Sequence, residues 1–150
     1  MPTLRILGNI VSGNAKQTQK VIDSNGLKFL KQTLVHSRKS IRKETCWILS
    51  NIAAGTQLQI EALILEDFLP LLEKIIKFDD VEIKKEAIWA VCNFSSIDNK
   101  QMAEIIIKQG IIELICFCLK NNDAKFIAVS LEALGNLLNF GVKFFNVFYI

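Results

Sequence analysis

One asparagine recurs along this 150-residue chain at almost constant spacing. Asn9, Asn51, Asn93 and Asn136 are separated by 42, 42 and 43 residues, and each closes a similar phrase: RILGN, WILSN, WAVCN and EALGN. A fixed period near 42 residues predicts a stack of structural repeats, because one such unit cannot bury its apolar face except against its neighbours.

Two further columns keep the register of the asparagines. The acids Glu44 and Glu86 lie seven residues before their asparagine. The position four residues before the asparagine holds, from the first repeat to the last, Arg5, Trp47, Trp89 and Glu132. Residues three or four apart share a helix face, so we expect acid, ring and amide on one side of one helix.

The apolar spacing within each period is typical of three helices rather than of strands. We expect first helices at 16–24, 58–67 and 99–109, second helices at 27–36, 69–78 and 111–120, and third helices at 39–54, 81–96 and 124–139. Pro70 fits a first helical turn. Gly13 and Gly55 follow third helices, where a positive φ is favoured. The sequence therefore predicts an all-α solenoid of the armadillo or HEAT kind.

We expect a single array without an internal linker. Its parts are a partial repeat at 1–13, repeats at 14–55, 56–97 and 98–140, and an apolar tail at 141–150. The chain opens inside a third helix, so we expect a piece of a longer array or an unusually short one. The tail has two interpretations: an altered repeat, or a docking and self-association patch.

Composition argues against several classes of function. Hydrophobic residues make up 51% of the chain, yet no apolar run approaches the roughly 18–20 residues of a membrane span. A net charge of +3 is too small to indicate nucleic-acid binding. With one histidine, no phosphate loop and no C-x-x-C pair, we expect no catalysis, no metal and no cofactor.

The chain resembles the armadillo repeats of importin α (karyopherin α), the nuclear-import adaptors. The phrases that carry the resemblance are LRILGNIVSGNAKQTQKVID (4–23), RKETCWILSNIAAG (42–55), IKKEAIWAVCNFSS (83–96) and GIIELICFCL (110–119). It covers about residues 4–140. The resemblance implies a right-handed α-solenoid of armadillo repeats, three helices per repeat of about 42 residues, from the third helix of repeat six through repeat nine.

The resemblance also implies a function and partners. The family binds basic nuclear localisation signals in a concave groove, and its smaller site lies around repeats six to eight. Importin β is implied only where an N-terminal segment is supplied, and the export receptor as a weak partner; the implied location is cytoplasm and nucleus. We expect no nucleic-acid or membrane partner. The expected peptide-binding residues are Arg5, Asn9, Glu44, Trp47, Ser50, Asn51, Glu86, Trp89 and Asn93.

These residue types suit an extended basic ligand. An asparagine amide offers both a donor and an acceptor, so a row of them can hold a peptide backbone without reading its side chains. Neighbouring indole faces form slots for Lys or Arg side chains, with a cation–π contribution of about 0.5–2 kcal/mol. By resemblance, Arg5 engages acidic or carbonyl groups and pairs with an acid of the groove.

Other interpretations stay open at this point. The tryptophans can be core residues, and Asn51 and Asn93 can tie neighbouring repeats together. Glu44 and Glu86 can pair with basic residues on their own helices. The alternative function is a general armadillo scaffold that binds another extended protein, since an asparagine ladder grips any backbone.

Overall fold

The structure is a computed structural model that describes residues 2–145. Among these residues ten helices follow one another and no strand occurs. Their bounds are α1 Pro2–Val11, α2 Ala15–Asp23, α3 Gly26–Leu34, α4 Lys39–Ala53, α5 Gln57–Leu65, α6 Phe68–Phe78, α7 Val81–Phe94, α8 Lys100–Lys108, α9 Ile111–Cys118 and α10 Ala124–Phe145.

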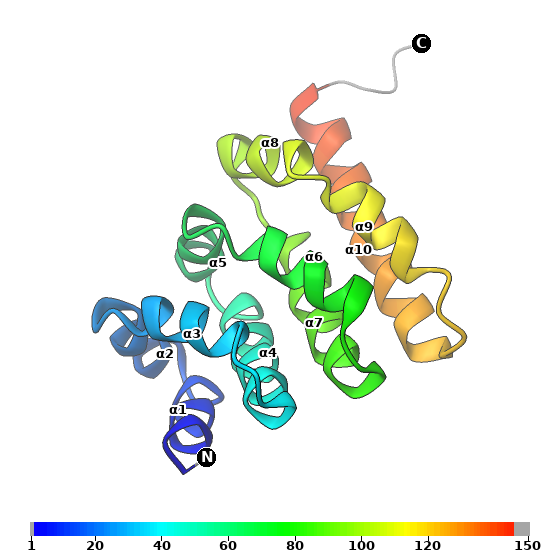
Figure 1. Ribbon diagram of the computed structural model, residues 1–150. Coiled ribbons are helices and arrows are strands. Elements are labelled where there is room, and N and C mark those ends of the chain that lie inside the picture. Colours follow the sequence, from blue (N-terminus) through cyan, green and yellow to red (C-terminus); the bar gives the residue numbers. More distant parts are fainter. Residues whose placement is uncertain (1, 146–150) are drawn as a thin grey trace.

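The third helices of the repeats form one layer of the molecule. Helix α4 packs against α1 on one side and α7 on the other, and α7 packs against α10 (Figure 1). The second helices α3, α6 and α9 pack on the third helices of their own repeats, and α5 stacks between α2 and α8. Three helices per repeat in a stacked array confirm the predicted α-solenoid.

Each first helix is connected to the second through a residue in the left-handed backbone conformation. The residues in this conformation are Asn25 (φ 60°), Asp67 (φ 54°) and Gly110 (φ 86°), which follow one another at the repeat period. The prediction of a positive φ at Gly13 and Gly55 is wrong, because Gly110 is the one glycine of the described residues with such an angle.

Gly13 and Gly55 instead make room for the side chain that caps the N-terminus of the next helix. Gln17 and Gln59 each accept a hydrogen bond through Oε1 from the backbone N–H three residues earlier, at 2.9 and 3.1 Å. A Cβ on either glycine would overlap that Oε1 atom. The glycines therefore leave room for a capping glutamine, which satisfies one of the free N–H groups near the start of a helix.

The core runs without a break through the stacked repeats. Leu49 and Ile52 of α4 and Phe94 of α7 are completely buried, and so is Phe68 at the start of α6. Cys46 and Cys92 also lie in the core as packing residues. Burial raises the pKa of the Cys92 thiol to about 12, which keeps it protonated at neutral pH.

Bounds were predicted for nine helices; eight of them, α2 to α9, lie within two residues of those observed, and α10 is the exception. It continues to Phe145, past the predicted end at 139, and takes in the first half of the predicted apolar tail. Phe140 is buried and Lys143 Nζ pairs with Asp98 at 2.7 Å, which holds the extra turns. Residues 146–150 of the predicted tail lie outside the described residues. No described helix is long and apolar enough to cross a bilayer.

Candidate functional site

A hollow of about 510 Å³ opens over the third helices α1, α4 and α7. Four residues that line it come from the predicted site: Arg5, Glu44, Trp47 and Glu86. Ser40 and Lys43 complete the lining and were not predicted. Helix α4 supplies the middle of the hollow, because Ser40, Lys43, Glu44 and Trp47 recur at spacings of three to four residues along one of its faces.

Within this hollow, Arg5 is held between a carboxylate and an aromatic ring. Its Nη2 lies 2.5 Å from Oε1 of Glu44, and its guanidinium carbon lies 5.7 Å from the ring centroid of Trp47. The Glu44 side chain is only 13% exposed, whereas that of Arg5 is 62% exposed. The pair joins α1 to α4, as the resemblance implied for Arg5, and does not join residues of one helix.

Glu44 keeps one oxygen without a partner. Its Oε2 is buried and makes no hydrogen bond with the described residues. A buried carboxylate oxygen that lacks a donor is costly, because water no longer solvates it. Glu44 is thus held by Arg5 through Oε1 alone among the described residues.

Glu86 is a second, less compensated acid of the same hollow. Its pKa is raised, mainly by burial; Lys43 opposes the shift, and the negative charges of Glu44 and Glu82 add to it. Among residues 2–145, Glu86 makes no ion pair. Glu86 is therefore a partly buried acid of the hollow that no ion pair compensates among these residues.

The two tryptophans differ in their surroundings. Trp47 is half-buried against the core and lies over the backbone of Gly8, where an added Cβ would overlap the ring. Trp89 is 40% exposed, and its ring meets Phe126 of α10 edge to face, with centroids 6.3 Å apart. Neither ring belongs wholly to the core, so each presents an aromatic surface to solvent or ligand.

Two asparagines tie neighbouring repeats together. Asn93 Nδ2 donates a hydrogen bond to the backbone oxygen of Ser50 at 3.0 Å, and Asn136 Nδ2 donates to Oγ of Ser95 at 3.2 Å. The interpretation of these amides as inter-repeat links therefore describes part of what Asn93 does. Its Oδ1 can still serve as an acceptor.

The other predicted polar residues are placed differently. Asn51 Nδ2 is buried without a partner, and Asn9 is exposed at the end of the row. Ser50 is largely buried, and its Oγ donates to the backbone oxygen of Trp47 at 2.8 Å. The hydroxyl of Ser50 is thus engaged within α4.

Sequence reasoning missed Gly8, although a signal for it exists. The residue just before each repeated asparagine is small in all four repeats: Gly8, Ser50, Cys92 and Gly135. A small residue at this position allows the ring of the next repeat to approach the helix backbone closely, as Trp47 does over Gly8.

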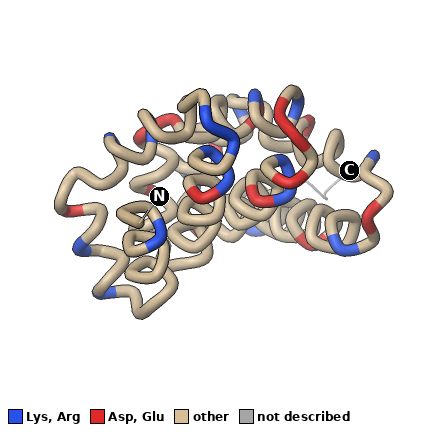
Figure 2. The backbone as a smooth tube through the Cα atoms, turned by 60° about the horizontal axis from the view of Figure 1, so that its bottom comes forward, with Lys and Arg blue, Asp and Glu red and all other residues tan. Residues whose placement is uncertain are grey.

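Charged residues gather at the same end of two neighbouring third helices. All charged residues of α4 and α7 lie within the first six residues of each helix. Figure 2 shows basic and acidic segments of the chain next to one another. Some of these charges neutralise one another, since Glu82 lies 3.4 Å from Lys43 and 3.2 Å from Lys85. Glu86 belongs to this cluster without such a partner.

The fold and this repeated site define an armadillo-repeat protein. Residues 14–54 match the Armadillo/beta-catenin-like repeat family. A designed armadillo repeat protein in complex with the peptide (KR)4 superimposes with a TM-score of 0.79 at 29% identity, over 92% of this chain and 62% of that one. A computationally designed armadillo repeat protein for modular peptide recognition gives 0.81 at 27% identity, with the same coverage. The solenoid is right-handed, like those of this class.

Three curated relatives narrow the class. The chain is 53% identical over 142 residues to importin subunit alpha-3 and 60% identical over 144 residues to importin subunit alpha-7, both of Arabidopsis thaliana. It is 48% identical over 142 residues to importin subunit alpha-1b of Oryza sativa subsp. japonica. The matches cover 94–95% of this chain and 27% of each relative. Over nearly its whole length the chain is therefore similar to part of the importin α subunits, and it spans about a quarter of their length.

Proposed function

We propose that this chain binds extended, basic peptides of the nuclear-localisation-signal kind along its third helices, as part of a nuclear-import adaptor. The binding surface would be the smaller of the two family sites, from Arg5 to Asn93. Similarity to importin α subunits supports this proposal, and so does the likeness to a designed repeat protein in complex with (KR)4.

The observation that carries the proposal is the position of Arg5. Its guanidinium lies against Glu44 and over Trp47. Within the chain, Arg5 thus makes the kind of contact with an acid and an indole ring that we propose for an Arg or Lys of the ligand. The ligand's contact would lie one repeat farther on, at Glu86 and Trp89. Arginine suits such a site because its planar guanidinium can stack on a ring while its N–H groups bind a carboxylate.

The ligand's cation would occupy the slot between Trp47 and Trp89, beside Glu86. Trp47 and Trp89 are one repeat apart, as Arg5 and Trp47 are, so this slot would have an aromatic wall on each side. Glu86 lies 42 residues after Glu44, so it would pair with the ligand's cation as Glu44 pairs with Arg5. A peptide Lys or Arg would supply the positive charge that Glu86 lacks.

The asparagines would hold the peptide backbone. Asn51 has a donor without a partner, and Asn93 has an acceptor beyond the hydrogen bond that it donates to Ser50. Donor and acceptor amides spaced by one repeat suit the C=O and N–H groups of an extended chain. Recognition would then divide into backbone contacts by asparagine and side-chain contacts by tryptophan and glutamate.

The same proposal covers partners and location. Cargo proteins with basic signals would be the ligands, importin β would join through an N-terminal segment of a longer chain, and the export receptor would bind weakly. The protein would act in cytoplasm and nucleus without catalysing a reaction. These properties rest on the similarity to importin α subunits, and the chain spans 27% of the length of these relatives.

Fluorescence anisotropy with a labelled Lys/Arg-rich signal peptide tests the proposal. We expect the Trp89→Ala variant to bind about 1–3 kcal/mol more weakly than the natural chain. A Trp47→Ala/Trp89→Ala double variant should lose selectivity against a charge-matched scrambled peptide, while its circular dichroism spectrum stays helical. Phe78→Ala is the matched control, because Phe78 is an 83% exposed aromatic residue outside the hollow.

Equal binding by the natural chain and the double variant would contradict the proposal. Equal affinity for a neutral extended peptide would instead favour the general scaffold, in which asparagine contacts alone hold the partner.

A further inference from the structure

Ser40 lines the hollow of the proposed peptide site but has no role in that proposal. It is the second residue of α4, it is exposed, and it shares the hollow of about 510 Å³ with Lys43, Glu44 and Glu86. A change of charge at Ser40 would therefore act on the side chains around the proposed position of the ligand's cation. Serine can carry such a change, because phosphorylation adds a charge of about −1.5 to −2 at neutral pH.

The sequence around Ser40 is basic on both sides. Arg38 and Lys39 precede it directly, and Arg42 and Lys43 follow it by two and three residues. Kinases select their substrates in part by charge, so a kinase with an acidic substrate groove (a basophilic kinase) takes serines that have Lys or Arg nearby. This pattern of charge makes Ser40 a suitable substrate for such a kinase.

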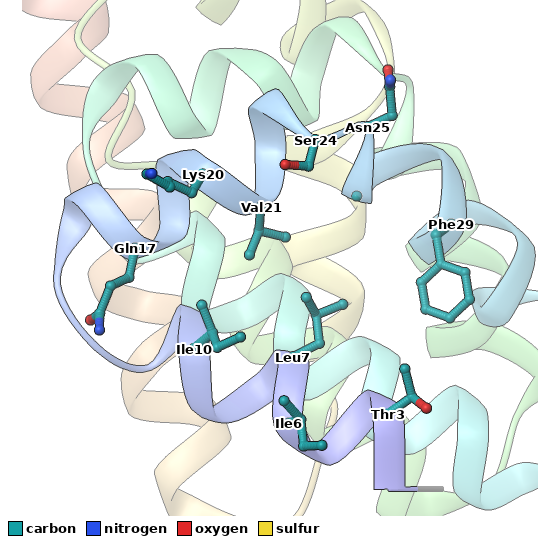
Figure 3. Close-up of a pocket in the computed structure, with 11 residues that line it drawn as sticks. Thr3, Ile6, Leu7, Ile10, Gln17, Lys20, Val21, Ser24, Asn25 and Phe29 are labelled. Atoms are coloured by element: carbon teal, nitrogen blue, oxygen red, sulfur yellow. The ribbon is translucent and has the colours of Figure 1, made fainter.

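Ser24 is a serine of another hollow that lacks this pattern. It is exposed and lines an apolar hollow of about 630 Å³ beside α1, α2 and α3 (Figure 3). Its direct neighbours are Asp23 and Asn25, and no Lys or Arg lies within three residues of it. Exposure and a place in a hollow are thus not enough to suit a basophilic kinase, and Ser24 provides an internal control for Ser40.

The repeat period indicates how an acid behaves at the position of Ser40. The equivalent residue, 42 positions later, is Glu82, the second residue of α7. Glu82 lies 3.2 Å from Lys85 of its own helix and 3.4 Å from Lys43 of the repeat before. Hydrogen bonds from these two lysines lower the pKa of Glu82. Its side chain is 64% exposed although a repeat lies on each side, so a negative charge fits this position within the array.

A phosphate on Ser40 would compete for Lys43. Lys43 follows Ser40 by three residues, as Lys85 follows Glu82, so the phosphate can make the contact that Glu82 makes. Burial raises the pKa of Glu86, and Lys43 opposes that shift. With Lys43 drawn to the phosphate, Glu86 would lose part of this compensation, and the phosphate would add its own negative charge to the hollow. Both effects favour a cationic ligand.

We propose that Ser40 is a phosphorylation site for a basophilic kinase and that its phosphorylation strengthens the binding of basic peptides to this groove. In the reaction, Oγ of Ser40 forms a bond to the γ-phosphorus of ATP, the bond from that phosphorus to the bridging oxygen of ADP breaks, and the hydroxyl proton passes to the catalytic base of the kinase. The effect on binding rests on the proposed function, because the phosphate acts on the ligand's cation.

Access for the kinase requires the first turn of α4 to open. Residues 35–38 lie outside the helices, and the terminal turns of helices open at a small cost in free energy. Nη1 of Arg42 holds this segment through hydrogen bonds to the backbone oxygens of His36 and Ser37, at 2.7 and 2.9 Å. We therefore expect the folded chain to be phosphorylated more slowly than an isolated peptide of the same sequence, but at the same serine.

Mass spectrometry after incubation with ATP and a basophilic kinase of the protein kinase C class tests the site. The natural chain should gain one phosphoryl group on Ser40, and Ser40→Ala should gain none. Ser37 and Ser24 should stay unmodified. A synthetic peptide of residues 34–45 is the positive control for the kinase. A folded chain that stays unmodified although the peptide reacts, or that reacts at Ser37 rather than at Ser40, would overturn the proposal.

Fluorescence anisotropy with the labelled Lys/Arg-rich peptide tests the effect on binding. We expect the phosphorylated chain to bind about 3–10-fold more tightly than the natural chain at about 0.15 M salt. Ser40→Glu should also bind more tightly, by a smaller factor, because it reproduces Glu82 of the next repeat. Ser37→Glu is the matched control: it adds the same charge to the same segment outside the hollow, and its affinity should stay within about twofold of the natural chain.

The outcomes separate this proposal from the proposed function. Unchanged or weaker affinity after phosphorylation, in a chain that binds the basic peptide before it, would overturn the present proposal and leave the proposed function standing. A natural chain that does not bind the basic peptide, although Ser40 is phosphorylated as expected, would contradict the proposed function and with it the regulation of binding.

Discussion

Gly8 lies so close to the ring of Trp47 that a Cβ at this position would overlap the ring atoms. We expect Gly8→Ala to reduce the free energy of unfolding by about 1–3 kcal/mol, because the ring must move out of its packed position. The emission of Trp47 should shift as well. Urea unfolding followed by circular dichroism and by tryptophan fluorescence measures both effects.

Gly135→Ala is the matched control for this substitution. Gly135 occupies the equivalent position in α10, and no atom outside its own helix backbone and chain neighbours lies within 4 Å of an added Cβ. The same substitution there should raise the free energy of unfolding by about 0.5–1 kcal/mol, as expected for glycine inside a helix. If Gly8→Ala stabilises the chain as much as Gly135→Ala does, Trp47 does not pack as described.

Glu86 makes the proposed binding dependent on pH. Its pKa is raised in the free chain, chiefly by burial, and a bound cation would favour the charged carboxylate. Affinity for a basic peptide should therefore be highest above this pKa and fall as the pH drops through it. Anisotropy titrations from neutral to mildly acidic pH, at constant ionic strength, measure the effect.

Glu86→Gln provides the comparison. This variant should bind more weakly at neutral pH and should show a smaller change in affinity as the pH falls. An unchanged pH profile in Glu86→Gln would mean that Glu86 does not cause the dependence.

Among the helices, the start of α4 is joined to the end of α6 by a bidentate ion pair. Arg42 Nε and Nη2 bind the two oxygens of Asp79 at 2.6 and 2.8 Å, and both side chains are largely buried. We expect Asp79→Asn to lower the free energy of unfolding by about 1–3 kcal/mol, because a guanidinium loses its counter-charge. Chemical denaturation at neutral pH measures this loss.

The pH dependence of stability follows from the same pair. The hydrogen bond from Arg42 holds the pKa of Asp79 below its usual value. A lowered pKa contributes stability above the unfolded-state pKa, and this stability is lost as the pH falls through the folded-state pKa. The difference between the natural chain and Asp79→Asn should therefore shrink in strong acid.

Glu73→Gln is the control for an ion pair of another kind. Glu73 pairs with Lys77 on its own helix, and both side chains are more than a third exposed. Its loss should cost less than about 0.5 kcal/mol. Equal costs for the two substitutions would show that the Arg42–Asp79 pair does not hold the repeats together.

The order and type of the helices could be predicted because a period of about 42 residues recurs in both the apolar core positions and the polar Asn, Trp and Glu positions of the third helices. The column of Asn, Trp and Glu likewise placed Glu44, Trp47 and Glu86 on neighbouring helices. Other features depend on contacts between distant residues, such as the pair of Arg42 with Asp79, and no local pattern reports them. The length of α10 depends on Phe140 and Lys143 packing against residues outside that helix.

At the scale of the whole molecule, repetition turns single contacts into a line of equivalent slots. Arg5 pairs with Glu44 and lies over Trp47 within the chain; in the proposed function the ligand's cation would bind one repeat farther on, beside Glu86, which makes no ion pair among residues 2–145. The net charge of +3 does not oppose this, since screening at physiological salt limits long-range repulsion to about 8 Å. Local pairing rather than total charge decides which ligand the groove prefers.

A double-mutant cycle on the slot beside Glu86 tests this account most directly. It combines Glu86→Gln in the protein with replacement of each Lys of a basic signal peptide, one at a time, by norleucine, which keeps the side-chain stem and removes the charge. Isothermal titration calorimetry gives the four binding free energies. We expect one peptide position to couple to Glu86 by about 1–2 kcal/mol, while the others stay within about 0.3–0.5 kcal/mol of additivity. Additivity at every position would contradict the claim that this slot holds the ligand's cation.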